Sequence, residues 1–461
     1  MTDLPPGWEW ATLEDLVSLE ARAMTDGPFG SNLKSSHYTA SGARVIRLQN
    51  IGDGQFIDER AYISLEHFEK LKAHEVHAGD LVVASLGDNP PRTCLIPDLD
   101  APAVVKADCI RVRLHSEVHS KWVLYALLAP ATKRYAAARI RGVGRPRLGM
   151  NEIRRIPIPV PPLAEQRRIV AALEDHLARL TYGLDCLEQA RNRTAALVGS
   201  VRDAYLCGVL DSLPPSWRRG HLREVLTDIE AGKSFACESR PAQADEWGII
   251  KVSAMTWGEF RDHENKAVPD GHLVDRRYEI QPGDILVSRA NTPAYVGAPV
   301  LVRNTRPKLL LSDKSLRLKP LPDIDREWLL QVLSAPSTRR QITERATGTK
   351  DSMRNISQQS LLDVEIPIAP PEVQISIGLR VRALIDDISR TRSELDRLER
   401  YADSLRRSIL AEAFAGRLVP QDLADEPAAE LLARIRAERA ASQPKRRTRR
   451  TTRPVQKETL L

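Results

Sequence analysis

The stretch Leu4-Pro5-Pro6-Gly7-Trp8 occurs twice in this chain of 461 residues, because it returns as Leu213-Pro214-Pro215-Ser216-Trp217. The segments that follow each copy also return in the same order. Gly79-Asp80-Leu81-Val82-Val83, for example, is answered by Gly283-Asp284-Ile285-Leu286-Val287. A period of roughly two hundred residues is too long for a stacked solenoid repeat. The sequence therefore predicts a duplicated domain and a molecule with pseudo-twofold symmetry.

Each copy ends in a Pro-Pro pair, Pro161-Pro162 or Pro370-Pro371, after which the apolar residues change their period. Apolar positions then recur at alternating spacings of four and three, which is typical of a coiled-coil seam. The first seam has a polar middle and comprises Leu173, Leu177, Leu180, Leu184, Leu187, Arg191, Thr194, Val198, Val201 and Tyr205. The second comprises Leu384, Ile388, Thr391, Leu395, Leu398, Ala402, Leu405 and Ile409. Each helix would end at a glycine, Gly208 or Gly416.

Each such helix would be some forty residues long, on the order of 60 Å, and could not bury its seam alone. We expect the two helices to pair antiparallel within one chain. Two alternatives remain open: each helix could dock on its own globular domain, or two chains could pair through these seams.

The regions between the helices predict a mixed α+β fold. Short apolar runs bounded by Gly, Asp, Asn and Pro are typical of strands, and helical stretches are expected between them, for example from Trp122 to Tyr135. The predicted division is two similar domains, residues 1–162 and 211–371, two helices, residues 163–210 and 372–419, and a tail, residues 420–461. Within the tail we expect a short amphipathic helix, Glu430 to Glu438, and then a disordered basic end.

The net charge of +7 is concentrated in that end. From Lys445 onward seven basic residues face the single acid Glu458, which leaves a net charge of about +1 for the rest of the chain. The end is either a solvated tail or a non-specific phosphate contact. A nucleic-acid-binding surface in the rest of the chain must therefore come from basic residues that cluster locally.

Other sequence features limit the class of protein. No apolar run is long enough to cross a bilayer and the start does not resemble a secretory signal, so a cytoplasmic protein is expected. The five cysteines are scattered and never spaced as Cys-x-x-Cys, which disfavours a disulfide framework and a structural zinc site.

Several fragments imitate catalytic motifs but lack the residue that carries the chemistry. Gly232-Lys233-Ser234 has Thr227 where a phosphate-binding loop needs its earlier glycine. Asp88-Asn89-Pro90-Pro91-Arg92 ends in arginine where amino-group methyltransferases place an aromatic residue. The histidines of His74-Glu75-Val76-His77 are one residue too close for a helical zinc site. Asp245 with Glu264-Asn265-Lys266 loosely fits a nuclease pattern that the first copy lacks. No catalytic or metal site is predicted, and the chain is expected to be a binding protein.

Polar side chains suited to base edges and phosphates gather near turns at comparable points of both copies. In the first copy the candidate DNA-binding residues are Asn32, Lys34, Arg47, Gln49, Asn50, Arg92, Arg139, Arg141, Arg145 and Arg147. In the second they are Lys233, Lys251, Ser253, Arg289, Asn291, Thr292, Lys350 and Arg354. The stretch from Arg134 to Arg147 holds five arginines and no acid, and is the densest basic stretch of the body.

From Leu4 to about Glu438, these residues in this order resemble the specificity subunits of type I restriction-modification systems. In the copies, the elements that carry the resemblance include Asp26 to Ser31, Arg47 to Ile51, Pro161 to Gln166, Lys251 to Ala254, Gly283 to Thr292 and Ser312-Asp313-Lys314. The most specific is Leu405 to Gln421, which is similar to the C-terminal conserved helix of that family. One departure is Pro370-Pro371-Glu372-Val373-Gln374, which is one residue shorter than its counterpart and lacks Leu-Ala-Glu-Gln.

The resemblance implies a subunit without catalysis or a cofactor of its own. Two target recognition domains would each read one half of a split, asymmetric sequence in double-stranded DNA, with half-sites about one helical turn apart, some 34 to 36 Å. The paired helices would act as a ruler and dock two methyltransferase subunits, which use S-adenosylmethionine; restriction subunits, which use ATP and Mg²⁺, would join them. The alternatives are a coiled-coil scaffold that contacts only protein, and a single-chain DNA methyltransferase or nuclease.

Overall fold

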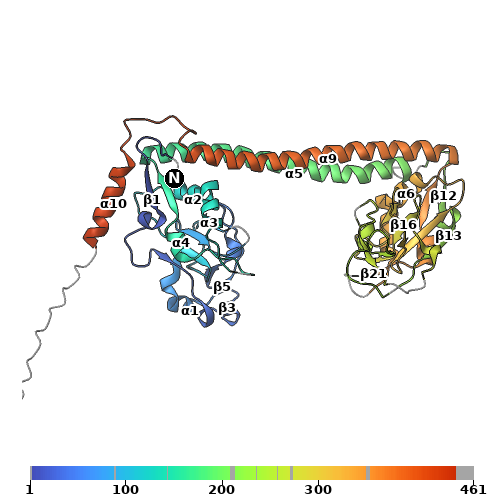
Figure 1. Cartoon of the computed structure of the whole chain (residues 1–461), viewed down its shortest axis with the longest axis horizontal. Coiled ribbons are helices and arrows are strands. Elements are labelled where there is room, and N and C mark those ends of the chain that lie inside the picture. The colour runs from blue at the N-terminus through green and yellow to red at the C-terminus, as the bar shows by residue number, and fades with distance from the viewer. Residues whose placement is uncertain are drawn as a thin grey trace, which may run out of the picture. The chain divides into compact units, whose positions relative to one another are not determined.

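The computed structural model describes residues 3–87, 90–142, 144–207, 213–234, 236–256, 258–269, 274–348 and 353–442. Contacts divide the chain into unit 1, Met1–Leu184 with Arg400–Leu461, and unit 2, Asp185–Glu399 (Figure 1). Lys350, Gly208 and the basic end after Ser442 lie outside the described residues, and so do the predictions made for them.

Unit 1 contains three small sheets, antiparallel except where β4 pairs with β9. A central four-stranded sheet has the order β2-β10-β7-β8, with β2 at Met24–Thr25, β10 at Cys109–Val112, β7 at Leu81–Ala84 and β8 at Arg92–Leu95. A second sheet has the order β3-β5-β4-β9-β6, with strands Tyr38–Thr39, Tyr62–Ile63, Ala43–Ile46, Ala103–Val105 and Glu75–Val76. In the third, β1 (Glu9–Thr12) pairs with β11 (Pro157–Val160).

Unit 2 repeats this plan. Its central sheet has the order β13-β20-β16-β18, with strands Leu226–Ala231, Ser315–Pro320, Ile285–Ser288 and Pro299–Leu301. A three-stranded sheet has the order β15-β14-β19, with strands Asn265–Ala267, Gly248–Ile250 and Leu309–Leu310, and β12 (Arg218–His221) pairs with β22 (Glu365–Ile368). A further short pair joins β17 (Ala290–Asn291) to β21 (Arg354–Asn355). The mixed α+β prediction and the internal repeat are confirmed.

The short helices correspond as well. Unit 1 has α1 (Leu65–Lys70), α2 (Ser120–Leu128), α3 (Pro130–Ala137) and α4 (Met150–Arg154), and unit 2 has α6 (Arg326–Ser334), α7 (Pro336–Arg345) and α8 (Gln358–Leu362). The stretch predicted to be helical, Trp122 to Tyr135, is helical except at Ala129, where the chain breaks between α2 and α3. Ala129 precedes Pro130 and is extended (φ −61°, ψ 145°), as the proline ring requires of the residue before it.

The two long helices are α5 (Leu163–Arg202) and α9 (Pro371–Phe414), as the change of period predicts. Buried Gln166 donates from Nε2 to the Pro161 carbonyl at 2.9 Å, and buried Gln374 donates to the Ala369 carbonyl at 2.8 Å. The repeated glutamine thus fixes the chain at the start of each helix. Gly416 follows the end of α9 with φ +68°, a conformation that glycine adopts without strain.

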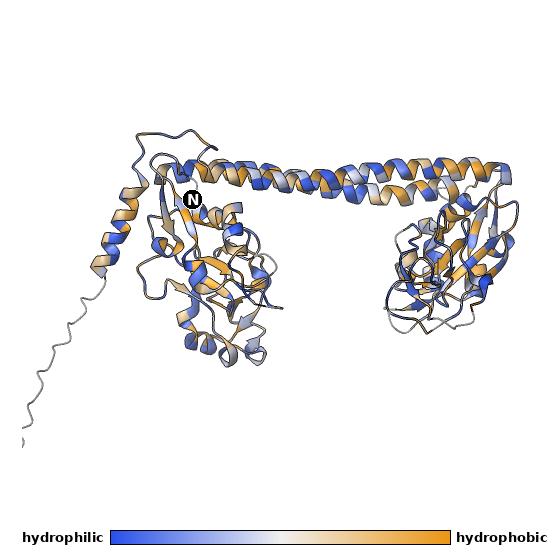
Figure 2. Cartoon of the chain, viewed as in Figure 1, coloured by the Kyte–Doolittle hydropathy of each residue, from blue (hydrophilic) through white to orange (hydrophobic). Residues whose placement is uncertain are grey.

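The long helices pack together with opposite chain directions. In unit 1 Leu173 of α5 shares a core with Leu410 and Ala413 of α9, whereas in unit 2 Arg191 of α5 faces Asp396 and Glu399 of α9. Bands of apolar residues recur along both helices (Figure 2). The seam is less closed than predicted, because Leu398 and Leu405 keep 46% and 39% of their surface exposed.

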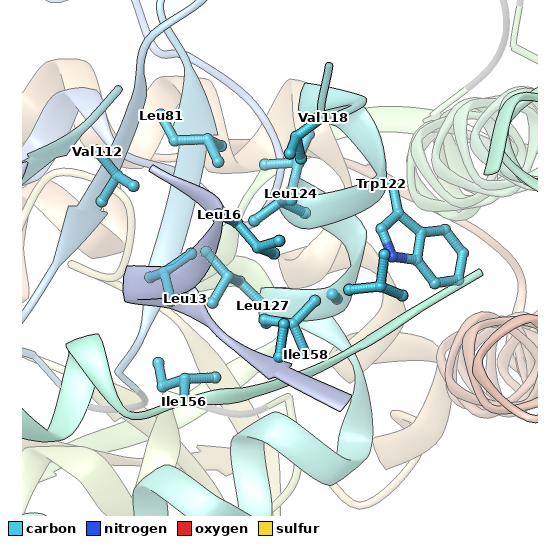
Figure 3. Packing of buried hydrophobic residues seen from close by; sticks show 14 of the residues in the cluster. Leu13, Leu16, Leu81, Val112, Val118, Trp122, Leu124, Leu127, Ile156 and Ile158 are labelled. Atoms are coloured by element: carbon cyan, nitrogen blue, oxygen red, sulfur yellow. The ribbon is translucent and has the colours of Figure 1, made fainter. Parts of the chain in front are cut away.

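The core of unit 1 reaches from the sheet to the helices. Leu13, Leu16 and Leu81 pack near Leu127, and Trp122 lies at the side of this cluster that faces the long helices (Figure 3). The same cluster takes in the C-terminal helix α10 (Ala428–Ser442) through Leu431, Leu432 and Ile435. The tail helix is therefore longer than predicted, and it is part of the core of unit 1.

Candidate nucleic-acid interface

The described part of the arginine-rich stretch, residues 134–142 and 144–147, includes a loop whose two sides pair next to the end of β7. Arg141 and Arg147 exchange backbone hydrogen bonds of 3.1 and 2.9 Å, and the Leu148 amide donates to the Ser85 carbonyl at 2.8 Å. Arg139, Arg141 and Arg145 are exposed. The guanidinium of Arg139 stacks on Tyr135, with 3.8 Å from Cζ to the ring centroid, and its Nε lies 3.4 Å from Glu152. The loop thus presents cations on the surface from a hydrogen-bonded frame.

Arg147 is held more firmly than its neighbours. Its Nη2 lies 2.8 Å from Asp26 Oδ2 and 3.1 Å from Asp108 Oδ1, and Cζ lies 5.4 Å from the centre of the Phe29 ring. The amides of Gly27 and Asp108 donate to the other oxygen of Asp26 at 2.8 and 2.9 Å. Burial raises the pKa of Asp26, while Arg147 and these amides oppose the shift. The contacts fix the orientation of the guanidinium, and the Arg147 side chain as a whole is still 39% exposed.

The other first-copy candidates divide into exposed and internal residues. Asn32, Lys34 and Gln49 are exposed, whereas Asn50 is fully buried. The Asn50 amide accepts from the Arg47 amide at 2.8 Å and donates to the carbonyls of Ile57 and Glu59 at 2.8 and 2.7 Å. Because these bonds use its polar atoms inside the fold, Asn50 shapes the loop and is not presented to a base.

Two arginines of the first copy, Arg47 and Arg92, are partly buried and contact neighbouring loop residues. Arg47 Nη2 lies 3.8 Å from Glu59 Oε2 and 3.4 Å from the Glu59 carbonyl. Arg92 donates from Nη2 to the Leu48 carbonyl at 3.2 Å. Both guanidinium groups keep further donors, so that a phosphate contact stays possible for them.

In unit 2 the fold brings Arg354 beside three candidates that lie about sixty residues earlier in the sequence. Asn291 lies directly opposite Arg354 in the pairing of β17 with β21, Arg289 precedes β17, and Thr292 follows it, exposed. A cavity of about 310 Å³ beside them is lined by Arg289, Asp313, Lys314, Thr347, Met353 and Asn355. Lys314 and Asn355, both exposed, were missed as candidates. Ser312-Asp313-Lys314 had been singled out only as a family motif.

The remaining second-copy candidates that the structure describes are Lys251, Ser253 and Lys233. The Ser253 hydroxyl donates to Glu264 Oε2 at 2.8 Å, and Lys251 Nζ lies 3.7 Å from the same oxygen. These two contacts lower the pKa of Glu264. Lys251 and Ser253 thus belong to a partly exposed ion-pair group with Glu264, which makes them weaker candidates for base contacts. Lys233 is exposed and lies 5.5 Å from the ring centre of Tyr278.

Over the described ranges, no group of three or more His, Cys, Asp or Glu side chains is arranged to hold a metal ion. In the same part of the chain, no helix has the length and apolar character that a membrane crossing requires. The arrangement of side chains supports binding through hydrogen-bond donors and positive charge.

The comparisons with known proteins agree with this arrangement. Residues 6–185 match the family model described as "Type I restriction modification DNA specificity domain". The chain is 34% identical over 167 residues to the type I restriction enzyme EcoEI specificity subunit of Escherichia coli, covering 36% of this chain and 28% of that protein. It is 24% identical over 462 residues to the EcoBI specificity subunit of Escherichia coli, covering 94% of both chains.

Coverage of the curated relatives is uneven, since the chain spans 28% of the EcoEI subunit and 66% of the EcoKI subunit. Two solved structures share the fold. The "Crystal structure of HsdS subunit from Thermoanaerobacter tengcongensis" has a TM-score of 0.53 at 20% identity, covering 90% of this chain and 98% of that one. A chain from a study of complex assembly in a type I restriction-modification system has a TM-score of 0.69 at 20% identity, covering 90% and 100%.

Proposed function

Because this chain belongs to the family of type I restriction-modification specificity subunits, we propose that it reads an asymmetric, bipartite sequence in double-stranded DNA. Residues 1–162 and 211–371 are the two target recognition domains in this proposal. Each reads one half-site. The chain is the non-catalytic subunit of its complex and holds no cofactor of its own.

One observation carries the proposal: two units whose central four-stranded sheets have the same strand order present different polar side chains at corresponding places. A repeated frame predicts two similar binding modes, and different side chains on it predict two different half-sites. The proposed contacts in the first domain are Asn32, Lys34, Arg47, Gln49, Arg92, Arg139, Arg141, Arg145 and Arg147. Those in the second are Lys233, Arg289, Asn291, Thr292 and Arg354, with Lys350, Lys251 and Ser253 as weaker candidates.

The long helices are proposed to set the distance between the half-sites and to dock two methyltransferase subunits. Large apolar side chains exposed on the helices support the docking role, because exposed apolar surface marks interaction sites. On α5 and α9 these side chains are Tyr182, Leu197, Ile375, Leu379, Leu398, Tyr401 and Leu405. In the assembled complex the methyltransferase subunits use S-adenosylmethionine, and restriction subunits use ATP and Mg²⁺.

The proposal is tested by co-expressing the full chain with its methyltransferase subunit and mapping N6-methyladenine in genomic DNA. The expected result is one methylated motif with two unlike parts and an unspecified spacer. A continuous or palindromic motif would contradict it. The purified chain alone, given DNA with Mg²⁺ or with S-adenosylmethionine, should neither cleave nor methylate.

A further inference from the structure

Arg147 in unit 1 and Asn355 in unit 2 occupy equivalent backbone positions. Arg147 exchanges two hydrogen bonds with Arg141 and forms a bridge to Leu86, just after β7. Asn355 exchanges two hydrogen bonds with Thr347, at 2.9 and 2.8 Å, and pairs with Ala290, just after β16. The following residue also matches, since the amides of Leu148 and Ile356 donate to the carbonyls of Ser85 and Arg289.

The residues around these positions correspond too, but their charges differ. The Ser85 amide donates to the Asp108 carbonyl, and the Arg289 amide donates to the Lys314 carbonyl, so Asp108 and Lys314 are equivalent. Gly27 lies against the backbone of Lys106, and Gly232 lies against the backbone of Leu311 and Ser312, in each case just before the equivalent residues Asp108 and Lys314. The residues that precede the two glycines, Asp26 and Ala231, are therefore equivalent. The first unit thus surrounds Arg147 with two carboxylates. The equivalent positions in the second unit are Ala231, which has no polar side chain, and Lys314, which lines the same cavity as Asn355.

The charges around each position favour the side chain that is present there, arginine at position 147 and asparagine at position 355. An asparagine at position 147 would leave the negative charges of Asp26 and Asp108 without their cation. An arginine at position 355 would meet the like charge of Lys314 and would find no equivalent of Asp26. Three equivalent positions therefore differ together: unit 1 has Asp26, Asp108 and Arg147 where unit 2 has Ala231, Lys314 and Asn355.

Both side chains keep polar atoms for a ligand. The carboxylates engage Nη2 of Arg147 and leave Nη1 without a hydrogen-bond partner among the residues that the structure describes. Within the same described part, the exposed Asn355 side-chain amide has no hydrogen-bond partner either. In the major groove, arginine donates to O6 and N7 of guanine, and asparagine pairs with N6 and N7 of adenine.

We propose that Arg147 and Asn355 are the corresponding base-reading residues of the two domains, Arg147 contacting guanine in one half-site and Asn355 contacting adenine in the other. Asp26 and Asp108 act as positioning residues, because they orient the guanidinium and touch no base. The inference rests on the proposed function and adds to it which residues discriminate between the half-sites.

The test maps N6-methyladenine in cells that express the full chain with its methyltransferase subunit. Arg147→Asn should make one guanine position of a single half-site degenerate or change it to adenine. Asn355→Ala should relax one adenine position of the other half-site only. The matched control is Arg134→Asn, which removes one positive charge from an exposed residue on α3 and should leave the motif unchanged.

Arg147→Lys covers the case in which Arg147→Asn fails to fold. Lysine keeps the charge beside Asp26 and Asp108 but lacks the planar fork, so the same guanine position should become degenerate. Discrimination of one base pair by a good contact is worth about 1–3 kcal/mol, or roughly 5- to 150-fold in relative methylation of the altered site.

The outcomes separate this inference from the proposed function. If the wild-type chain yields no bipartite methylated motif, the proposed function fails. If the wild-type motif is bipartite but the folded Arg147 and Asn355 variants lower methylation equally at all sites, these residues contact phosphate and the base-reading assignment is overturned. A wild-type motif with no G·C pair in either half-site overturns the Arg147 assignment as well.

Discussion

At the scale of single residues, buried polar groups join the start of α5 to the N-terminal segment of unit 1. Trp8 Nε1 donates to Glu165 Oε2 at 3.0 Å, and Gln421 donates to the other oxygen at 3.4 Å. The Glu165 side chain is buried, and this burial raises its pKa. Ionisation of Glu165 therefore costs more in the folded chain than in the unfolded chain.

The expected consequence is a pH-dependent stability of unit 1. The contribution of Glu165 to the free energy of unfolding is fully present below the ordinary pKa of 4.5 and is lost as pH rises through the raised pKa. Glu165→Gln keeps an acceptor for Trp8 but has no charge, so it should be the more stable protein at neutral pH and should lose this dependence. Urea unfolding followed from pH 4 to pH 8 measures it. The matched control is Glu9→Gln, an exposed residue of β1; parallel curves for wild type and Glu165→Gln would contradict the prediction.

At the scale of elements, α10 is predicted to stabilise unit 1 although it follows both long helices in the sequence. Ile435 is 1% exposed, and α10 packs against the short helix Leu13–Leu16. Ile435→Ala should cost about 2–5 kcal/mol, because it leaves a cavity in the core. Calorimetry of the full chain should show the transition of unit 1 lowered by about 2–4 °C per kcal/mol. Leu423→Ala, at a side chain that is 90% exposed, should leave the transition in place.

The long helices predict the spacer of the DNA site. One heptad can be inserted into each helix where Arg191 faces Asp396 without disturbing the seam. The insertion lengthens each helix by about 10 Å, which is close to the axial length of three base pairs of DNA. The methylated motif should then carry a spacer about three base pairs longer with both half-sites unchanged. Seven residues added between α9 and α10, outside both helices, should not alter the spacer. If both insertions give the wild-type spacer, the helices are not a ruler.

At the scale of the whole molecule, the repeat predicts that the half-sites can be made identical. A chain in which residues 1–162 also replace residues 211–371 should direct methylation of a palindromic motif. Mapping of N6-methyladenine checks this, and retention of the asymmetric wild-type motif would show that the replaced domain does not read DNA.

One ion pair should decide whether that chimera folds. Lys121 Nζ lies 2.6 Å from Glu174 in unit 1, whereas the equivalent pair in unit 2 is reversed, with Arg382 Nη1 3.6 Å from Glu327. The equivalence follows from the buried residues next to each, Trp122 with Trp328 and Leu173 with Val381. The chimera would place Lys121 beside Arg382, so the additional change Arg382→Glu should raise its yield of soluble, active complex.

The sequence alone predicted the features that depend on local pattern. The duplication, the start of α5 after Pro162, the seam that includes Leu173 and the end of α9 before Gly416 follow from repeats, period and glycine conformation, which a chain carries in any surroundings. The break at Pro130 could also be predicted from the sequence, since a proline disfavours helix at the preceding residue.

Only the tertiary structure decided which polar residues are exposed to a ligand. Asn50 is buried by contacts that its loop makes, Arg147 meets Asp26 across 121 residues, and Asn291 faces Arg354 across a strand pair. The contacts of Arg147 and Asn291 depend on the packing of elements far apart in the chain, and no local spacing encodes them. The Asn50 bonds lie within one loop, but only the folded loop shows that the side chain turns inward.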